Sequence, residues 1–318
     1  MRISRFIAVF ACIPAIAFGQ AYPSKPIRIV VPFPPGGVDM TLRLIQSVMT
    51  GELGQPLVID NRAGANGYIG TENVVRSAPD GYSLLATSVA VVAAPPVMKA
   101  PYDPIKDLMP ITQMISTLGV VIVRPTLPVK SIGELVDYAK KNPGKLSYAS
   151  SGIGSVQHID GELFKRLTGT DIVHVPYKGA GPQVQAIVAQ EVDLSYFPLQ
   201  QIKQHIDSGK AKMIAVADEQ RNLDMPNVPS INETVPQFRR TPGWVGLFGP
   251  AGLPQAIVAR VNAAAVKALR TPEVKAKIEE TAIVSANSAE EFAKIVREDY
   301  ERIGRIVADL RAHGVKFE

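Results

Sequence analysis

Ser155, His158 and Asp160 are the residues whose types come nearest to a hydrolytic site. A serine nucleophile needs a histidine base within about 3 Å and a third group that orients the base. Ser155 and His158 are three residues apart and could share one face of a helix, whereas Asp160 would lie on another face. The Gly-x-Ser-x-Gly turn of the α/β-hydrolases is also missing around Ser155. Ser155 is more simply a helix N-cap and His158 a hydrogen-bond donor or a packed residue, so a secreted serine hydrolase is kept as an alternative.

The histidines and the cysteine do not form a metal-binding pattern. His158, His174, His205 and His313 fall in separate predicted elements, and no two of them have the spacing of metal ligands. Cys12 is the only cysteine, so neither a disulfide nor a zinc–sulfur cluster can form within one chain. We therefore predict no catalytic residue, no metal site and no cofactor.

A pattern that favours ligand binding is the glycine-rich loop after a buried strand, at residues 31–39 (VPFPPGGVD). Glycine lets a backbone approach a ligand closely, and the first turn of the following helix offers unpaired N–H groups to an anion. Asp39 is placed to cap that helix. A nucleotide phosphate loop is not predicted, because no Gly-Lys-Ser/Thr follows and the prolines lack N–H donors. The alternative is an ordinary strand-to-helix turn.

Two further loops have the same character, at residues 61–70 (NRAGANGYIG) and 149–158 (ASSGIGSVQH). Both are rich in glycine and in hydroxyl or amide groups, which suits the binding of a carboxylate by backbone and side-chain donors. A short turn at Thr87 and Ser88 could add two hydroxyls. Ligands of open α/β sheets bind at the carboxyl ends of strands, where these loops lie. The predicted ligand-binding residues are Phe33, Pro35, Gly36, Gly37, Asp39, Asn66, Gly67, Thr87, Ser88, Ser150, Ser151, Gly152, Ser155 and His158.

The elements that must hold these loops indicate an α/β fold. Short runs rich in Val and Ile alternate with helical patterns, which is typical of sheets covered by helices on both faces. Ser131 with Glu134 predicts a capping box, and Ser155 with Gly169 brackets the next helix. The predicted strands are residues 27–33, 57–61, 82–88, 120–124, 146–150, 172–176, 193–197 and 213–217. The predicted helices are residues 40–53, 70–78, 132–141 and 155–167, and then 254–269 and 288–311, the last with a capping box of Ser288 and Glu291.

The first residues have the three-part layout of a secretory signal peptide. Arg2 and Arg5 form a basic start, an apolar run follows, and small residues allow cleavage after Gly19 or Ala21. The run is shorter than the about 20 residues of a membrane span, and a buried N-terminal helix is the alternative. Cys12 is expected to be lost with this peptide, since a bulky phenylalanine stands where a lipoprotein signal has a small residue.

Charge and hydropathy exclude two further classes of protein. The chain of 318 residues has 34 Lys and Arg against 29 Asp and Glu, and loss of Arg2 and Arg5 lowers its net charge from +5 to +3. That charge is too small for a nucleic-acid-binding surface, so no nucleic-acid partner is predicted. No other stretch approaches the length of a membrane span, and 46% hydrophobic residues are typical of a folded globular protein.

The C-terminal part differs from the rest of the chain, because after residues 244–248 it is mostly helical. It contains too little strand for a third sheet, so we expect it to pack back on the first lobe. Two segments, near 118–124 and 238–245, would then cross between two lobes with a cleft between them. The predicted divisions are 1–21 for the signal peptide, 22–120 for the first part of lobe 1, 121–243 for lobe 2 and 244–318 for the return to lobe 1.

Six segments of the chain, in this order, resemble one protein family. They are residues 22–27 (YPSKPI), 31–37 (VPFPPGG), 61–70 (NRAGANGYIG), 78–82 (APDGY), 148–152 (YASSG) and 174–179 (HVPYKG). The combination resembles the periplasmic receptors of tripartite tricarboxylate transporters, which are the Bug-type solute-binding proteins. The similarity runs from about residue 22 to the C-terminus.

The resemblance implies a type II periplasmic binding protein, whose two lobes close like a Venus flytrap on a small organic carboxylate. It implies that residues 33–39 and 150–155 hold one ligand carboxylate through backbone groups and bridging waters, with residues 66–67 and 87–88 beside them. It also implies delivery to a two-component integral membrane permease and no enzymatic activity. A monomer is expected.

The chain departs from the family pattern at two positions. Only Val38 lies between Gly37 and Asp39, where the family usually has two residues, which leaves the role of Asp39 open. Ala63 stands where the family commonly has proline. Aliphatic di- or tricarboxylates and aromatic carboxylates remain alternative ligands. A sensory binding protein that partners a membrane kinase would have the same fold and remains an alternative function.

Overall fold

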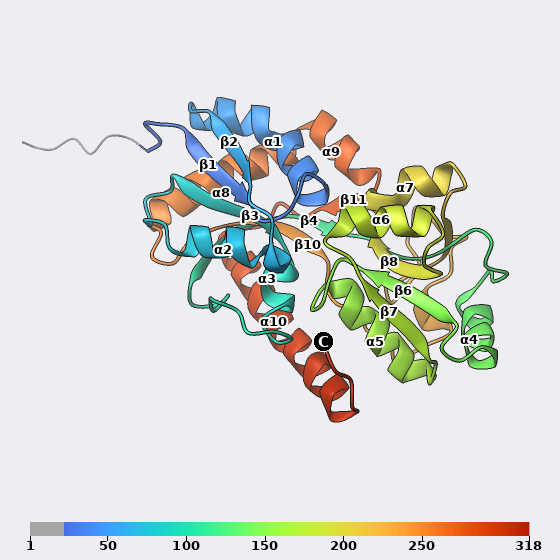
Figure 1. The fold of residues 1–318 in the computed structure, drawn as a ribbon. Helices are drawn as coiled ribbons and strands as arrows, with labels where there is room; N and C mark the ends of the chain where they lie inside the picture. The colour runs from blue at the N-terminus through green and yellow to red at the C-terminus, as the bar shows by residue number, and fades with distance from the viewer. Residues whose placement is uncertain (1–21, 318) are drawn as a thin grey trace, which may run out of the picture.

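The computed structural model describes residues 22–317, so the predicted signal peptide lies outside the described residues. The described chain forms a six-stranded and a five-stranded sheet. Helices flank each sheet, and the two units lie side by side (Figure 1). The prediction of a two-lobed α/β fold is confirmed.

The first sheet is mixed and combines strands from both ends of the described chain. It contains β1 (Ile27–Val31), β2 (Leu57–Asn61), β3 (Ser83–Ser88), β4 (Leu108–Thr117), β10 (Trp244–Pro250) and β11 (Ala282–Val284), in the order β11-β4-β10-β3-β1-β2. β1 pairs in parallel with β2 and β3. β10 runs antiparallel between β3 and β4, and β11 runs antiparallel to β4.

Helices cover both faces of the first sheet. They are α1 (Gly37–Leu53), α2 (Tyr68–Val75), α3 (Ala90–Ala93), α8 (Gln255–Leu269), α9 (Pro272–Glu279) and α10 (Ala289–Ala312), with a short 3₁₀ turn η1 (Ala65–Gly67). Ile29 of β1 packs in the same cluster as Leu42 of α1, whereas the next residue, Val30, packs in the cluster of Val74 and Val92. Successive side chains of a strand point to opposite faces, so both faces are buried. This explains the continuous apolar run of β1.

The second sheet is built in the same way from a contiguous part of the chain. It contains β5 (Gly119–Val123), β6 (Leu146–Ser150), β7 (Ile172–Pro176), β8 (Leu194–Pro198) and β9 (Lys212–Val216), in the order β7-β6-β8-β5-β9. β6 is parallel to β7 and β8, and β5 is antiparallel to β8 and β9. The accompanying helices are α4 (Ile132–Lys141), α5 (Val156–Thr168), α6 (Ala180–Val188) and α7 (Leu199–Asp207), with a 3₁₀ turn η2 (Ile231–Glu233).

Side-chain caps fix where two of the predicted helices begin. Ser288 accepts the N–H of Glu291, whose carboxylate accepts the N–H of Ser288, so the capping box of α10 is confirmed. Ser131 accepts the N–H of Glu134 at the start of α4. The carboxylate of Glu134 reaches the N–H of Lys130 instead of closing the box on Ser131, so only half of this predicted box forms. The predicted bounds of α4 are nevertheless those of the structure.

Several elements have no clear pattern in the sequence. β4 is interrupted by Pro110 and by the polar residues Thr112 and Gln113, so its ten residues do not form an apolar run. α6 and α7 have nine residues each and begin without a side-chain cap. Nine residues are fewer than the window over which helical periodicity is recognised, although Leu199, Ile202 and Ile206 of α7 do follow it. The elements that the sequence did not predict are α3, α6, α7, α9, β4 and β11.

The longest helix, α10, contacts both units. It packs along β4, α3 and α8 of the first unit and against α5 of the second (Figure 1). Arg166 of α5 and Asp309 of α10 form an ion pair of 2.9 Å, and Ile159 of α5 lies in the same apolar cluster as Ile303. Neither α10 nor another helix within residues 22–317 is long and apolar enough to cross a membrane.

Candidate functional site

The loops predicted to bind a ligand leave the two sheets at the carboxyl ends of parallel strands. β1, β2 and β3 are parallel, so the loops that follow them start at one edge of the first sheet. β6, β7 and β8 are also parallel, so residues 151–155, residues 177–179 and the junction of β8 with α7 start at one edge of the second sheet. Gln200 of α7 donates from Nε2 to the carbonyl oxygen of Gly37 at 3.2 Å. This hydrogen bond joins the two sets of loops.

The first loop leads directly into α1, which begins at Gly37 with Gly36 as its N-cap. The prediction that Asp39 caps this helix is wrong, because Asp39 is already its third residue. Its carboxylate accepts hydrogen bonds from the guanidinium of Arg43, one turn later, at 2.8 and 3.1 Å. Since Gly36 has no side chain, the first N–H groups of α1 have no side-chain cap. They stay available to an anion.

The second loop packs directly against the first. Asn61 donates from Nδ2 to the carbonyl oxygen of Phe33 at 3.1 Å. Gly67 has a φ of 92°, and a Cβ on it would lie 3.2 Å from the ring of Phe33. Asn66 also has left-handed backbone angles, with φ 53° and ψ 34°. The structure therefore brings Phe33, Asn66 and Gly67 together, while Pro35 is exposed beside them.

The end of β3 adds its two hydroxyl residues to the same edge of the sheet. Thr87 is buried and pairs with Gly246 of β10 in the ladder. Ser88 accepts the N–H of Ala90 at 3.4 Å, at the start of α3. Ser88 therefore already has one partner in the chain.

The third loop is held by its own side chains. Ser150 is fully buried, and its Oγ lies 2.6 Å from Nε2 of His174 and 3.2 Å from both the N and the O of Gly152. Ser151 donates from Oγ to Oε1 of Gln157 at 3.1 Å. These bonds fix the turn after β6, so the backbone of Ser151 and Gly152 is in a defined position.

His158 lies on the far side of this turn, among aromatic and charged side chains. Its ring stacks on that of His174 with centroids 3.9 Å apart, and its Nδ1 accepts the N–H of Gly154 at 3.2 Å. Burial lowers the pKa of His158 to about 3 and that of His174 to about 4. Both rings, together with Glu162 and Lys165, line a cavity of about 500 Å³ at the β7 edge of the second sheet. The structure therefore places His158 in this cavity wall.

The three residues of the hydrolase alternative do not form a triad. Oγ of Ser155 accepts the backbone N–H of His158 at 3.3 Å as the N-cap of α5, while the His158 ring turns to the stack described above. Asp160 accepts the backbone N–H of Thr241 at 2.7 Å. Burial raises the pKa of Asp160 to about 7. The arrangement gives a helix cap and a buried link to the segment before β10, and it lacks the serine–imidazole contact that nucleophilic catalysis needs.

Metal binding finds no support in the described side chains. Within residues 22–317, no three His, Cys, Asp or Glu side chains are grouped closely enough to hold an ion. Apart from Asp39 and His158, the uncharged polar groups of the predicted binding residues are hydroxyls, one amide and backbone groups, which suit an organic anion better than a transition metal.

Two residues at the contact between the units were missed by the sequence analysis. Gln200 and Gln201 are the second and third residues of α7, which follows β8 directly. A Cβ on Gly37 would lie 2.9 Å from Nε2 of Gln201 and 3.3 Å from Nε2 of Gln200. The rule that finds ligand loops at the ends of parallel strands also applies to β8. It could have indicated these glutamines if α7 had been predicted.

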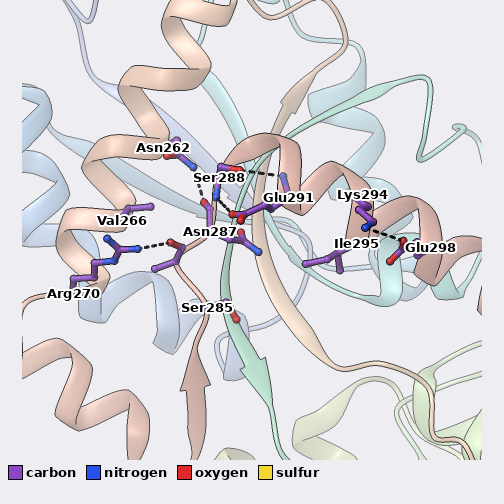
Figure 2. Close-up of a pocket in the computed structure, with 11 residues that line it drawn as sticks. Asn262, Val266, Arg270, Ser285, Asn287, Ser288, Glu291, Lys294, Ile295 and Glu298 are labelled. Carbon is purple, nitrogen blue, oxygen red and sulfur yellow. Dashed lines mark hydrogen bonds and ion pairs between the residues drawn. The ribbon is translucent and has the colours of Figure 1, made fainter.

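A larger cavity of about 790 Å³ lies away from all of these loops. It lies between α8, the segment before α10 and the first turns of α10 (Figure 2). Asn262 donates to the carbonyl oxygens of Ile111 and Asn287, and Arg270 donates to that of Ala286. Its polar side chains therefore already have partners, and none of the residues predicted to bind a ligand lines it.

Two Bug proteins are similar to this chain, one in sequence and one in both sequence and fold. The protein BugT of Bordetella pertussis is 33% identical over 285 residues, which cover 86% of this chain and 87% of BugT. The structure of the periplasmic binding protein BugD has a TM-score of 0.84 at 31% identity and covers 91% of this chain and 98% of BugD.

Two related structures contain a carboxylate. MatC of Rhodopseudomonas palustris, with bound malate, has a TM-score of 0.83 at 32% identity and covers 90% of this chain and all of MatC. A second R. palustris protein, solved with adipate, has a TM-score of 0.84 at 30% identity, with 90% of this chain and 98% of that protein covered.

The family is identified over most of the chain. The model of the tripartite tricarboxylate transporter family receptor, TctC, matches residues 41–311. This range includes α1 from its fifth residue onward, the second and third loops, the whole second sheet and most of α10. The chain belongs to the TctC family of tripartite tricarboxylate transporter receptors.

Proposed function

We propose that this protein is an exported receptor that binds a small organic carboxylate between its two lobes and delivers it to a two-component membrane permease. The observation that carries the proposal is the meeting of the two sets of strand-end loops at Gly37 and Gln200. Relatives of this chain are solved with malate and with adipate, which supports a carboxylate as the ligand class.

The proposed carboxylate site lies between the start of α1 and the turn after β6. Uncapped N–H groups at the start of α1 can donate to one carboxylate, and the backbone of residues 151–152 would contact it from the second lobe. Phe33, Asn66, Thr87 and Ser88 would line the same space. Backbone N–H groups and hydroxyls can hold an anion here by hydrogen bonds from neutral donors.

Transport, in this proposal, needs movement rather than chemistry. The ligand stabilises the closed arrangement because it contacts both lobes at once, so only the loaded receptor has its lobes in the form that a permease recognises. The proposed lobes are residues 22–120 with 244–318, and residues 121–243. The proposed export signal is residues 1–21, cleaved after Gly19 or Ala21, and the exported protein would act as a periplasmic monomer.

A thermal unfolding screen tests the receptor function directly. A ligand present at 100 times its dissociation constant should raise the free energy of unfolding by about 2.7 kcal/mol. We expect at least one aliphatic or aromatic carboxylate to raise the melting temperature, and neutral sugars to leave it unchanged. A shift by a sugar alone, or no shift by any carboxylate, would count against the proposal.

An ester-hydrolysis assay on the same preparation tests the enzyme alternative. Because Ser155 caps α5 and does not contact the imidazole of His158, we expect no turnover above the buffer rate. Turnover that disappears in Ser155→Ala would contradict the receptor function and favour a hydrolase.

A further inference from the structure

The side chain of Gln201, in α7, has a buried oxygen, Oε1, without a hydrogen-bond partner among residues 22–317. A buried amide oxygen without a donor has lost its hydration and gained nothing in return, so such atoms are rare in folded proteins. A donor from outside the chain would remove this cost.

The position of Gln201 shows where such a donor would have to lie. The side chain starts in the first turn of α7 and extends to Gly37, the first residue of α1, with Nε2 2.9 Å from the Cβ position of that glycine. Its neighbour Gln200 donates to the carbonyl oxygen of Gly37. The unpaired oxygen of Gln201 therefore lies beside the N-terminus of α1, where the ligand carboxylate is proposed to bind.

Asn66 provides a complementary unpaired group on the first lobe. Its Nδ2 is buried and also has no partner in the described part of the chain. The adjacent Gly67 lies against the ring of Phe33, in the same loop that ends at Gly37. The first lobe thus offers an unpaired donor and the second an unpaired acceptor.

We propose that Asn66 and Gln201 determine the substrate class, and that the preferred ligand is a carboxylate with a hydroxyl or ammonium donor next to the carboxylate. This inference rests on the proposed receptor function. A carboxylate oxygen can accept from Nδ2 of Asn66, but an ionised carboxylate has no hydrogen to donate to Oε1 of Gln201. An unsubstituted acid leaves Gln201 unpaired, whereas a hydroxy or amino acid pairs with it as the lobes close.

Matched ligand pairs test this selectivity by calorimetric titration. The protein is purified from the periplasm after expression of the full-length chain, and titrated with succinate, L-malate and L-aspartate, and with adipate and 2-hydroxyadipate. We expect a substituted acid to bind about tenfold or more tightly than its unsubstituted partner, the effect of one added buried hydrogen bond. This comparison needs no variant and so does not depend on whether a variant folds.

Variants then assign the selectivity to its residues. In Gln201→Met the preference for the substituted acid should fall to about threefold or less, because the acceptor is gone. Gln204→Met, the same change at an exposed position of α7, should keep it. In Asn66→Gly, the glycine can adopt the left-handed backbone conformation of this position. This variant should bind both acids of a pair more weakly by a similar factor, since both have the carboxylate.

The remaining outcomes separate this inference from the receptor function. Equal affinity for substituted and unsubstituted acids, or a preference that survives in Gln201→Met, would overturn the inference and leave a carboxylate receptor. If none of the five acids binds in this titration and the wider thermal screen also finds no carboxylate ligand, the receptor function fails and the inference falls with it.

Discussion

At the scale of single residues, Gly37 lies directly against side chains of the other unit. Two carboxamides of α7 lie where its side chain would be, so the absence of a Cβ is what lets them approach. Its backbone is helical and needs no left-handed conformation. A side chain here would therefore disturb the approach of the lobes more than the fold of either lobe.

Replacement of Gly37 by leucine should weaken ligand binding by about tenfold or more, because the new side chain collides with both glutamines in the closed form. The free energy of unfolding should change by less than about 1 kcal/mol. Gly51→Leu is the control, since Gly51 lies in the same helix with no atom near its Cβ position. Calorimetric titration and urea unfolding measure the two effects, and unchanged affinity would remove Gly37 from the site.

The buried histidine pair should make the fold sensitive to acid. His158 and His174 have pKa values of about 3 and 4 because burial disfavours the charged ring, so between pH 6.5 and about 4 the unfolded chain binds protons that the folded chain does not. The free energy of unfolding should therefore fall as the pH falls through this range. Asp160, whose pKa burial raises to about 7, acts in the opposite direction.

Urea unfolding of wild type and His158→Gln at pH 7, 6, 5 and 4 isolates this effect. Between pH 7 and 4, the free energy of unfolding should fall by roughly 1–3 kcal/mol less in the variant than in wild type, as expected for a pKa shift of this size. His313→Gln, at an exposed position, serves as the control. The same pH dependence in wild type and His158→Gln would show that His158 does not cause the loss of stability in acid.

At the scale of elements, the sequence predicts those whose ends have a local signal. α4 and the capping box of α10 follow from serine and glutamate three residues apart, and β2, β6 and β7 follow from short apolar runs. The sequence does not predict β4, because Pro110 and the polar residues interrupt its apolar pattern. The strand forms through its pairing with β10 and β11 on either side. The prediction of Asp39 as the N-cap is wrong because α1 already starts at Gly37, two residues earlier, and glycine has no capping side chain.

The capping box of α10 should contribute measurably to stability. Ser288→Ala removes the hydroxyl that accepts the N–H of Glu291, and should lower the free energy of unfolding by about 1 kcal/mol. Ligand affinity should not change, because this helix start is remote from the proposed site. Ser208→Ala, at an exposed helix C-terminus, should stay within about 0.5 kcal/mol of wild type. Equal stability of the Ser288 and Ser208 variants would show that the box is not a significant cap.

At the scale of the whole molecule, the two units are held together by α10 and by the contact of α7 with α1. The sequence predicts the loops on each unit, since each follows a strand of its own sheet. It does not predict that Gln200 lies on Gly37, because this contact depends on how the units are placed relative to one another. No local pattern contains that information.

Closure should be visible in solution scattering. With a bound carboxylate, the radius of gyration should approach the about 19 Å expected for a compact chain of this length. Without ligand it should be larger, because the hydrogen bond from Gln200 to Gly37 is too weak to keep the loops of the two lobes together, although α10 still joins the units. Gln200→Met should bind ligand less tightly yet reach the same closed radius at saturation. Identical scattering with and without ligand would rule out closure as the receptor's response.

The place of β10 between β3 and β4 has a consequence for how the chain folds. β10 follows the whole second sheet in the sequence, yet it is the strand that joins β3 to β4. The five strands of the second sheet are contiguous and need no later segment to pair, whereas the first sheet must wait for distant residues. Pulsed hydrogen exchange should therefore protect the amides of β6 and β8 before those of β3 and β4, and the reverse order would contradict this. A newly exported chain would pass through a stage with one finished sheet and one split sheet, in which proteases can still cut the first unit while the second is protected.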